Sequence, residues 1–156
     1  MQTRRHVNRL SLAALTLAAS AAVIGFSGCS MMAPPSNLVA LTTQLRGDNE
    51  VPPKPGPGTG SVDAVFNKST NLLRWKANYA GLSGPVTGAH FHGPAAVGAN
   101  AGVVLGWQAP LTNGLEGSAT LTPAQAADLL AGRWYANLHT AANPGGEVRG
   151  QMTVRN

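Results

Sequence analysis

Three histidines are the residues of this sequence best suited to chemistry. His90 and His92 are separated by one residue, and His139 lies much further along the chain. If residues 90–92 form a strand, the two side chains point to the same side with Cα atoms about 6.5–7 Å apart, so both imidazoles can reach one ion. Imidazole nitrogen binds copper and zinc well. The pattern is consistent with a copper or zinc site, which can include His139 only if its strand lies beside that of the pair.

Other interpretations of these histidines stay open. Glycine-rich turns can place three solvated or carbonyl-bonded histidines on the surface, and His139 can instead pair with a glutamate. Glu50 and Glu147 are candidate metal ligands, or acceptors that fix the tautomer of a liganding histidine. Each is equally consistent with a carboxylate at a turn or strand end that pairs with Arg46 or Arg149.

The sequence offers little for catalysis. It has no Gly-x-Ser-x-Gly motif, and no pair of acidic residues stands in a clear acid/base context. The glycine-rich segment 56–60 lacks the lysine and the helix of a phosphate-binding loop. We therefore expect that the protein is not an enzyme.

Short strands must position the histidines. Alternation of apolar and polar residues, or a short apolar run between turn residues, predicts about eight strands. They lie at residues 39–45, 62–66, 73–79, 86–92, 103–107, 115–121, 133–139 and 147–155. The proline-rich segment 51–58 cannot donate enough N–H groups to a sheet, so it is predicted to be a stiff connection.

One short helix is predicted among the strands. Thr122 is a candidate N-cap, Pro123 suits the first helical position, Gln125 can bond back to the cap, and Gly132 can end the helix. Eight short strands with one connecting helix, and no alternation of strand and helix, predict an all-β fold. We expect an antiparallel Greek-key β-sandwich.

The last two predicted strands can be aligned residue by residue. If they pair as a hairpin, His139 faces Glu147, Leu138 faces Val148 and Trp134 faces Met152. One face is then apolar, made of Trp134, Ala136, Leu138, Val148, Gly150, Met152 and Val154. The other face is polar and carries Tyr135, Asn137, His139, Glu147, Arg149 and Gln151. This even division supports the register.

The N-terminus has the order of a secretory signal peptide. A basic segment at 1–9 precedes an uncharged run at 10–26, and Ser27-Gly28-Cys29 resembles the end of a bacterial lipoprotein signal. We expect a signal peptide at 1–28, a lipid on Cys29, a tether at 29–37 and a folded domain at 38–156. The protein would then be exported and anchored in the cell envelope, on the outer membrane or the periplasmic face in a Gram-negative cell.

Two alternatives concern this export signal. Ordinary cleavage after a small residue such as Ala33 would discard Cys29. The run from Thr3 to Val7, which contains Arg4 and Arg5, also resembles a twin-arginine signal.

Composition limits the class of partner. Of the 156 residues, 44% are hydrophobic and 11% are charged, while Gly and Pro together number 30, which indicates one domain rich in turns. The net charge of +5 falls to about +2 without Arg4, Arg5 and Arg9, and no basic run remains. Nucleic acid is therefore excluded as the main partner. A single cysteine excludes an intramolecular disulfide.

Three motifs resemble the CHRD domain, a module named after chordin and also found alone in bacterial exported proteins. They occupy residues 45–53, 88–95 and 135–151, and the resemblance covers about 38–156. It implies a non-catalytic binding or structural module of the cell envelope, with an envelope or extracellular protein as partner.

A second likeness is to the copper/zinc superoxide dismutase sandwich. By that likeness His90 and His92 match two copper ligands on one strand, and His139 matches a later one. A bridging histidine, a zinc-loop aspartate and a cysteine pair are missing, so we adopt the fold and not the dismutase activity. The superoxide-dismutase-like and immunoglobulin-like sandwiches are both consistent with the strand pattern. A copper or zinc protein with a redox-related role remains the alternative function.

Overall fold

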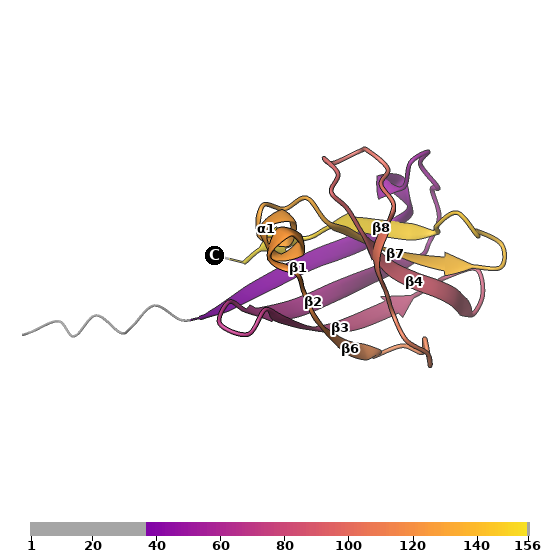
Figure 1. Ribbon diagram of the computed structural model, residues 1–156. Helices are drawn as coiled ribbons and strands as arrows, with labels where there is room; N and C mark the ends of the chain where they lie inside the picture. Colours follow the sequence, from indigo (N-terminus) through magenta and orange to yellow (C-terminus); the bar gives the residue numbers. More distant parts are fainter. Residues whose placement is uncertain (1–36, 156) are drawn as a thin grey trace, which may run out of the picture. The chain divides into compact units, whose positions relative to one another are not determined.

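The structure is a computed structural model that describes residues 37–155 (Figure 1). The predicted signal peptide, Cys29 and almost all of the tether lie outside the described residues. The strands are β1 Leu38–Arg46, β2 Thr59–Asn67, β3 Leu72–Ala80, β4 Val86–His92, β5 Val103–Gly106, β6 Glu116–Thr120, β7 Tyr135–Thr140, β8 Val148–Gln151 and β9 Thr153–Val154. A 3₁₀ helix spans Gly47–Asn49, and the α-helix α1 spans Pro123–Leu130.

All the strands belong to one antiparallel sheet. Their order is β5-β4-β7-β8-β1-β2-β3-β6, and β9 pairs with β1 beside β8. The sheet curls, so that β3 and β4 face each other across the core although they are not neighbours. Trp75 of β3 and Phe91 of β4 have ring centroids 5.3 Å apart. The predicted all-β, antiparallel fold with about eight strands and one short helix is confirmed.

Apolar side chains at alternate positions build the core. The alternation predicted in the first three strands is confirmed, because Leu41, Val62 and Leu73 lie in the same buried cluster as Phe91 and Trp134. The predicted caps of α1 are also confirmed. The Thr122 side chain accepts from the Gln125 N–H, and the Gln125 side chain accepts from the Thr122 N–H.

The strands near the C-terminus differ from the prediction at two points. β7 begins at Tyr135 because the Arg133 N–H still bonds to the Asp128 carbonyl of the helix. The last predicted strand is divided at Met152, which is fully buried and donates its N–H to the Trp134 carbonyl. β8 therefore pairs mainly with β7, and β9 pairs with β1.

The predicted register of the last hairpin is confirmed. Leu138 pairs with Val148, and the next pairs outward keep the same alignment. The N–H of Glu147 donates to the Leu138 carbonyl, which places Glu147 opposite His139. In the described part of the chain, no helix is long and apolar enough to cross a membrane.

Candidate metal centre

The sheet order brings the three histidines onto one face. β4 and β7 are neighbours, with His90 opposite Asn137, Gly88 opposite His139 and His92 opposite Tyr135. Phe91, between the two histidines of β4, points into the core and is fully buried. The strand adjacency that a three-histidine site requires is therefore present.

The imidazole nitrogens converge. His90 Nδ1 lies 3.1 Å from His139 Nε2, and one ligand nitrogen of each of the three histidines lies within 4.8 Å of the others. A tetrahedral ion with metal–nitrogen bonds of about 2.0–2.1 Å holds its ligands roughly 3.3 Å apart. The closest pair already has this spacing, and the third histidine lies beside it.

Backbone carbonyls fix two of the rings. His139 Nδ1 lies 2.9 Å from the Pro144 oxygen, and His92 Nδ1 lies 3.0 Å from the Ala101 oxygen. A carbonyl oxygen only accepts, so each Nδ1 carries the proton and each Nε2 presents a lone pair. Metal-binding histidines are commonly held in this way. His92 Nε2 is buried and has no hydrogen-bond partner within residues 37–155.

Burial disfavours the charged form of His90 and His92. It lowers the pKa of His90, and the neighbouring His139 and His92 lower it further. Burial also lowers the pKa of His92, by more than the Ala101 carbonyl and the Asn137 side chain raise it. Both rings are therefore neutral at pH 7, as a metal ligand must be. His90 and His139 are half-buried, which leaves the site open to solvent on one side.

Asn137 lies at the centre of the site and was missed as a functional residue. It is 3% exposed, and its Oδ1 is 3.0 Å from His139 Nε2. The sequence places Asn137 on the polar face of the hairpin, but only the pairing of β4 with β7 sets it opposite His90.

Tyr135 and Arg149 form a layer beside the histidines. The His92 ring stacks parallel to the Tyr135 ring at 4.8 Å, and the Arg149 guanidinium lies 3.4 Å from the centre of that ring. Arg149 donates to Asn100 Oδ1 and to the Ala99 carbonyl, and the Tyr135 hydroxyl bonds to Ala101. These bonds hold the segment that follows β4 over the polar face.

Glu50 lies behind Asn137. It is buried, and this burial raises its pKa to about 7, although Arg149, the Val51 N–H and a hydrogen bond from the Asn137 side chain act in the opposite direction. The predicted ion pair of Glu50 with Arg46 or Arg149 does not form among the described residues. The charge of Arg149 acts on Glu50 only by lowering its pKa.

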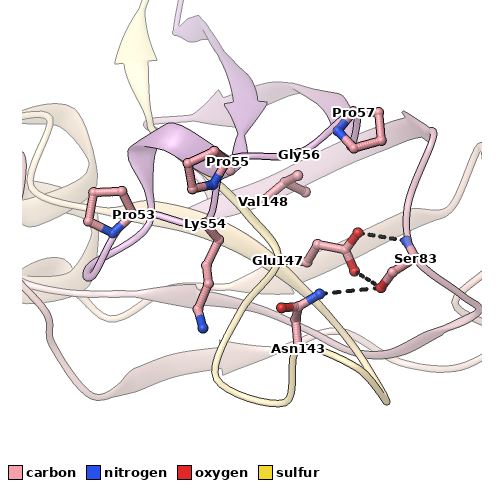
Figure 2. A pocket seen from close by; sticks show the side chains of 11 residues that line it. Pro53, Lys54, Pro55, Gly56, Pro57, Ser83, Asn143, Glu147 and Val148 are labelled. Carbon is pink, nitrogen blue, oxygen red and sulfur yellow. Dashed lines mark hydrogen bonds between the residues drawn. The ribbon is translucent and has the colours of Figure 1, made fainter.

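Glu147 belongs to a separate cluster. Its carboxylate accepts from the Ser83 N–H, the Ser83 hydroxyl and the Thr140 hydroxyl, each at 2.6 Å. Figure 2 shows the Glu147 carboxylate turned toward Ser83. Both residues line a cleft of about 320 Å³, and Lys54 lines it as well. Burial raises the pKa of Glu147, but these hydrogen bonds together bring it below its ordinary value.

This placement corrects two expectations about Glu147. The ion pair considered with Arg46 or Arg149 does not form, because hydroxyl and amide donors occupy both carboxylate oxygens. The same donors leave Glu147 without a hydrogen bond to a histidine in the part of the chain that is described. The structure thus brings the three histidines together with Asn137. Glu147 lies opposite His139, but its carboxylate is turned to Ser83 and Thr140.

Comparison with known proteins gives one match. The family model described as the CHRD domain matches residues 41–152. That range includes the three histidines and both glutamates. No curated protein and no solved structure matches the chain.

Proposed function

The chain belongs to the CHRD domain family, and on that premise we propose that it is an exported, non-catalytic binding module that holds one divalent copper or zinc ion. His90, His92 and His139 are the ligands. The observation that carries the proposal is the convergence of their ring nitrogens within 4.8 Å, from two strands that are distant in the sequence.

The donor set suits both copper(II) and zinc(II). Three imidazoles supply nitrogen ligands, and no cysteine lies in residues 37–155. Affinity for nitrogen ligands peaks at copper(II) among the first-row divalent ions, whereas the 3.1 Å spacing of His90 Nδ1 and His139 Nε2 fits the tetrahedral geometry of zinc(II). Redox use of a bound copper ion would be a separate property, and it is not part of the proposal.

A binding role agrees with the surroundings of the histidines. Glu147 is saturated by hydrogen bonds, and Glu50 is buried behind Asn137, so neither carboxylate is placed as a solvent-exposed base beside the ion. Catalysis of proton transfer needs such a group within reach of the reacting atoms. The described residues therefore support retention of an ion better than chemistry on a substrate.

Metal titration of alanine variants tests the site. Chelator-treated protein is titrated at pH 7.4 with Cu(II) and with Zn(II), followed by His90→Ala, His92→Ala and His139→Ala. One ion per chain is expected, and each substitution should weaken binding by at least about tenfold, which is 1.4 kcal/mol. Lys68→Ala, at an exposed residue after β2, is the control and should bind as the wild type does.

Two results would contradict the metal site. One is a dissociation constant weaker than about 10 μM for both ions in the wild type. The other is three small, independent losses among the variants, as expected for scattered surface histidines.

We propose further that Cys29 anchors the module to a membrane, with an envelope or extracellular protein as its partner. The support is the order of basic segment, uncharged segment and Ser27-Gly28-Cys29. Two or more acyl chains give stable anchoring, whereas one gives marginal binding. Wild-type protein should fractionate with membranes, and Cys29→Ser should carry no lipid. Soluble wild-type protein that begins at another residue would contradict the anchor.

A further inference from the structure

We propose, resting on the metal site above, that the side-chain oxygen of Asn137 is a fourth donor to the bound ion. The donor set is then three imidazole nitrogens and one amide oxygen.

The position of Asn137 supports direct binding. It lies opposite His90 in the sheet and two residues before His139 on the same face of β7. Its Oδ1 is 3.0 Å from His139 Nε2, close to the 3.1 Å that separates the nitrogens of His90 and His139. Ligands of one tetrahedral ion are roughly this far apart.

The balance of hydrogen-bond donors and acceptors around His139 Nε2 also favours a bound cation. Because His139 Nδ1 donates to the Pro144 carbonyl, His139 Nε2 presents a lone pair. The amide oxygen of Asn137 faces this nitrogen and is also only an acceptor. His90 Nδ1 carries at most one proton to share with these acceptors. A divalent ion satisfies all of these electron pairs at once.

Zinc binding at pH 8 tests the proposal. In protein labelled with ¹³C,¹⁵N-asparagine, saturation with Zn(II) should shift the side-chain carbonyl resonance of Asn137 more than that of Asn100, which bonds to Arg149. Zn(II) affinity should fall about tenfold in Asn137→Ala and rise about tenfold in Asn137→Asp, since aspartate keeps an oxygen donor and adds charge. A merely structural asparagine predicts that both substitutions weaken binding.

Glu147→Gln is a control variant. It changes a buried carboxylate that bonds to Ser83 and Thr140 and to no histidine, and it should leave the Zn(II) affinity unchanged.

The outcomes separate the two proposals. If the wild type takes up neither zinc nor copper, the proposed function itself fails. If the three histidine variants lose the ion while Asn137→Asp binds as weakly as Asn137→Ala and the Asn137 carbonyl resonance does not move, the site stands and the fourth donor is wrong. The resonance is measured in the wild type, so it remains decisive if a variant does not fold.

Discussion

The two faces of the β7–β8 hairpin are both buried, but by different means. On one face Trp134 and Leu138 have no solvent exposure, and on the other Asn137 and Arg149 have 3% and 2%. The first face packs against apolar side chains of the curled sheet. The second is covered by segments that bond to it, as Asn100 does to Arg149 and Pro144 does to His139. In this hairpin, polar side chains are therefore as deeply buried as apolar ones.

The difference separates stability from binding. The apolar face belongs to an aromatic cluster, in which Phe91 lies 5.8 Å from Trp134 and 5.0 Å from Trp107 between ring centroids. Such packing contributes through burial and dispersion. Its buried polar atoms without a partner in the described chain are the indole N–H groups of Trp75, Trp107 and Trp134, which only donate and so cannot bind a cation. The polar face holds the histidines. On this face the Nε2 atom of His92 is buried and has no hydrogen-bond partner within the described chain. We infer that the apolar face contributes most of the stability of the fold and that the polar face binds the proposed metal ion.

The largest effect is expected on the apolar face. Trp134→Ala removes a fully buried indole and should lower the free energy of unfolding by about 3–5 kcal/mol. Urea unfolding of the metal-free protein measures it. A loss below about 1 kcal/mol would mean that the apolar face does not carry the stability assigned to it.

A smaller loss is expected at Tyr135, its neighbour on the polar face. Tyr135→Ala removes the stacking on His92 and the contact with Arg149, and should cost about 2–3 kcal/mol and weaken metal binding. Tyr135→Phe keeps the ring and loses only the two hydrogen bonds of the hydroxyl with Ala101, about 1–2 kcal/mol. Equal losses in the two variants would mean that the ring itself contributes nothing.

The smallest effects are expected from the two buried carboxylates, and they depend on pH with opposite signs. The pKa of Glu50 is raised to about 7, so its ionisation opposes folding increasingly between pH 4.5 and 7. Metal-free Glu50→Gln should therefore be more stable than the wild type at pH 8, by about 1–2 kcal/mol, and similar to it at pH 4.5.

Glu147 is the counterpart of Glu50. Its pKa is lowered, so the ionised group stabilises the fold above its ordinary pKa of 4.5, and this contribution is lost as the pH falls through the lowered value. Glu147→Gln should therefore be less stable than the wild type at pH 8. Urea unfolding at the two pH values measures both variants, and the same sign for both would contradict the assignment of these environments.

Sequence patterns predicted the apolar half of this comparison well. Alternation identified Leu41, Val62 and Leu73 as core, and the opposite polarity of adjacent residues fixed the hairpin register from Trp134 onward. These signals are local, because strand periodicity repeats every second residue. The caps of α1 are local in the same sense, and they too were predicted.

The polar half depended on contacts that no local pattern carries. The pairing of β4 with β7 joins residues about fifty positions apart, and it alone places Asn137 opposite His90. The cover of Tyr135 by Ala101, and the hydrogen bonds that turn the Glu147 carboxylate to Ser83 and Thr140, follow from how the connecting segments return to the sheet. The three histidines could be named from their types and spacing, but their environment could not.

The central claim is that one face of β4 and β7 is built around a single ion, and anomalous diffraction tests it most directly. Crystals grown with one equivalent of Cu(II) are measured on both sides of the copper absorption edge. We predict one peak about 2.0–2.1 Å from His90 Nδ1, His92 Nε2 and His139 Nε2. A peak elsewhere on the protein, or none beside the three histidines, would contradict the account.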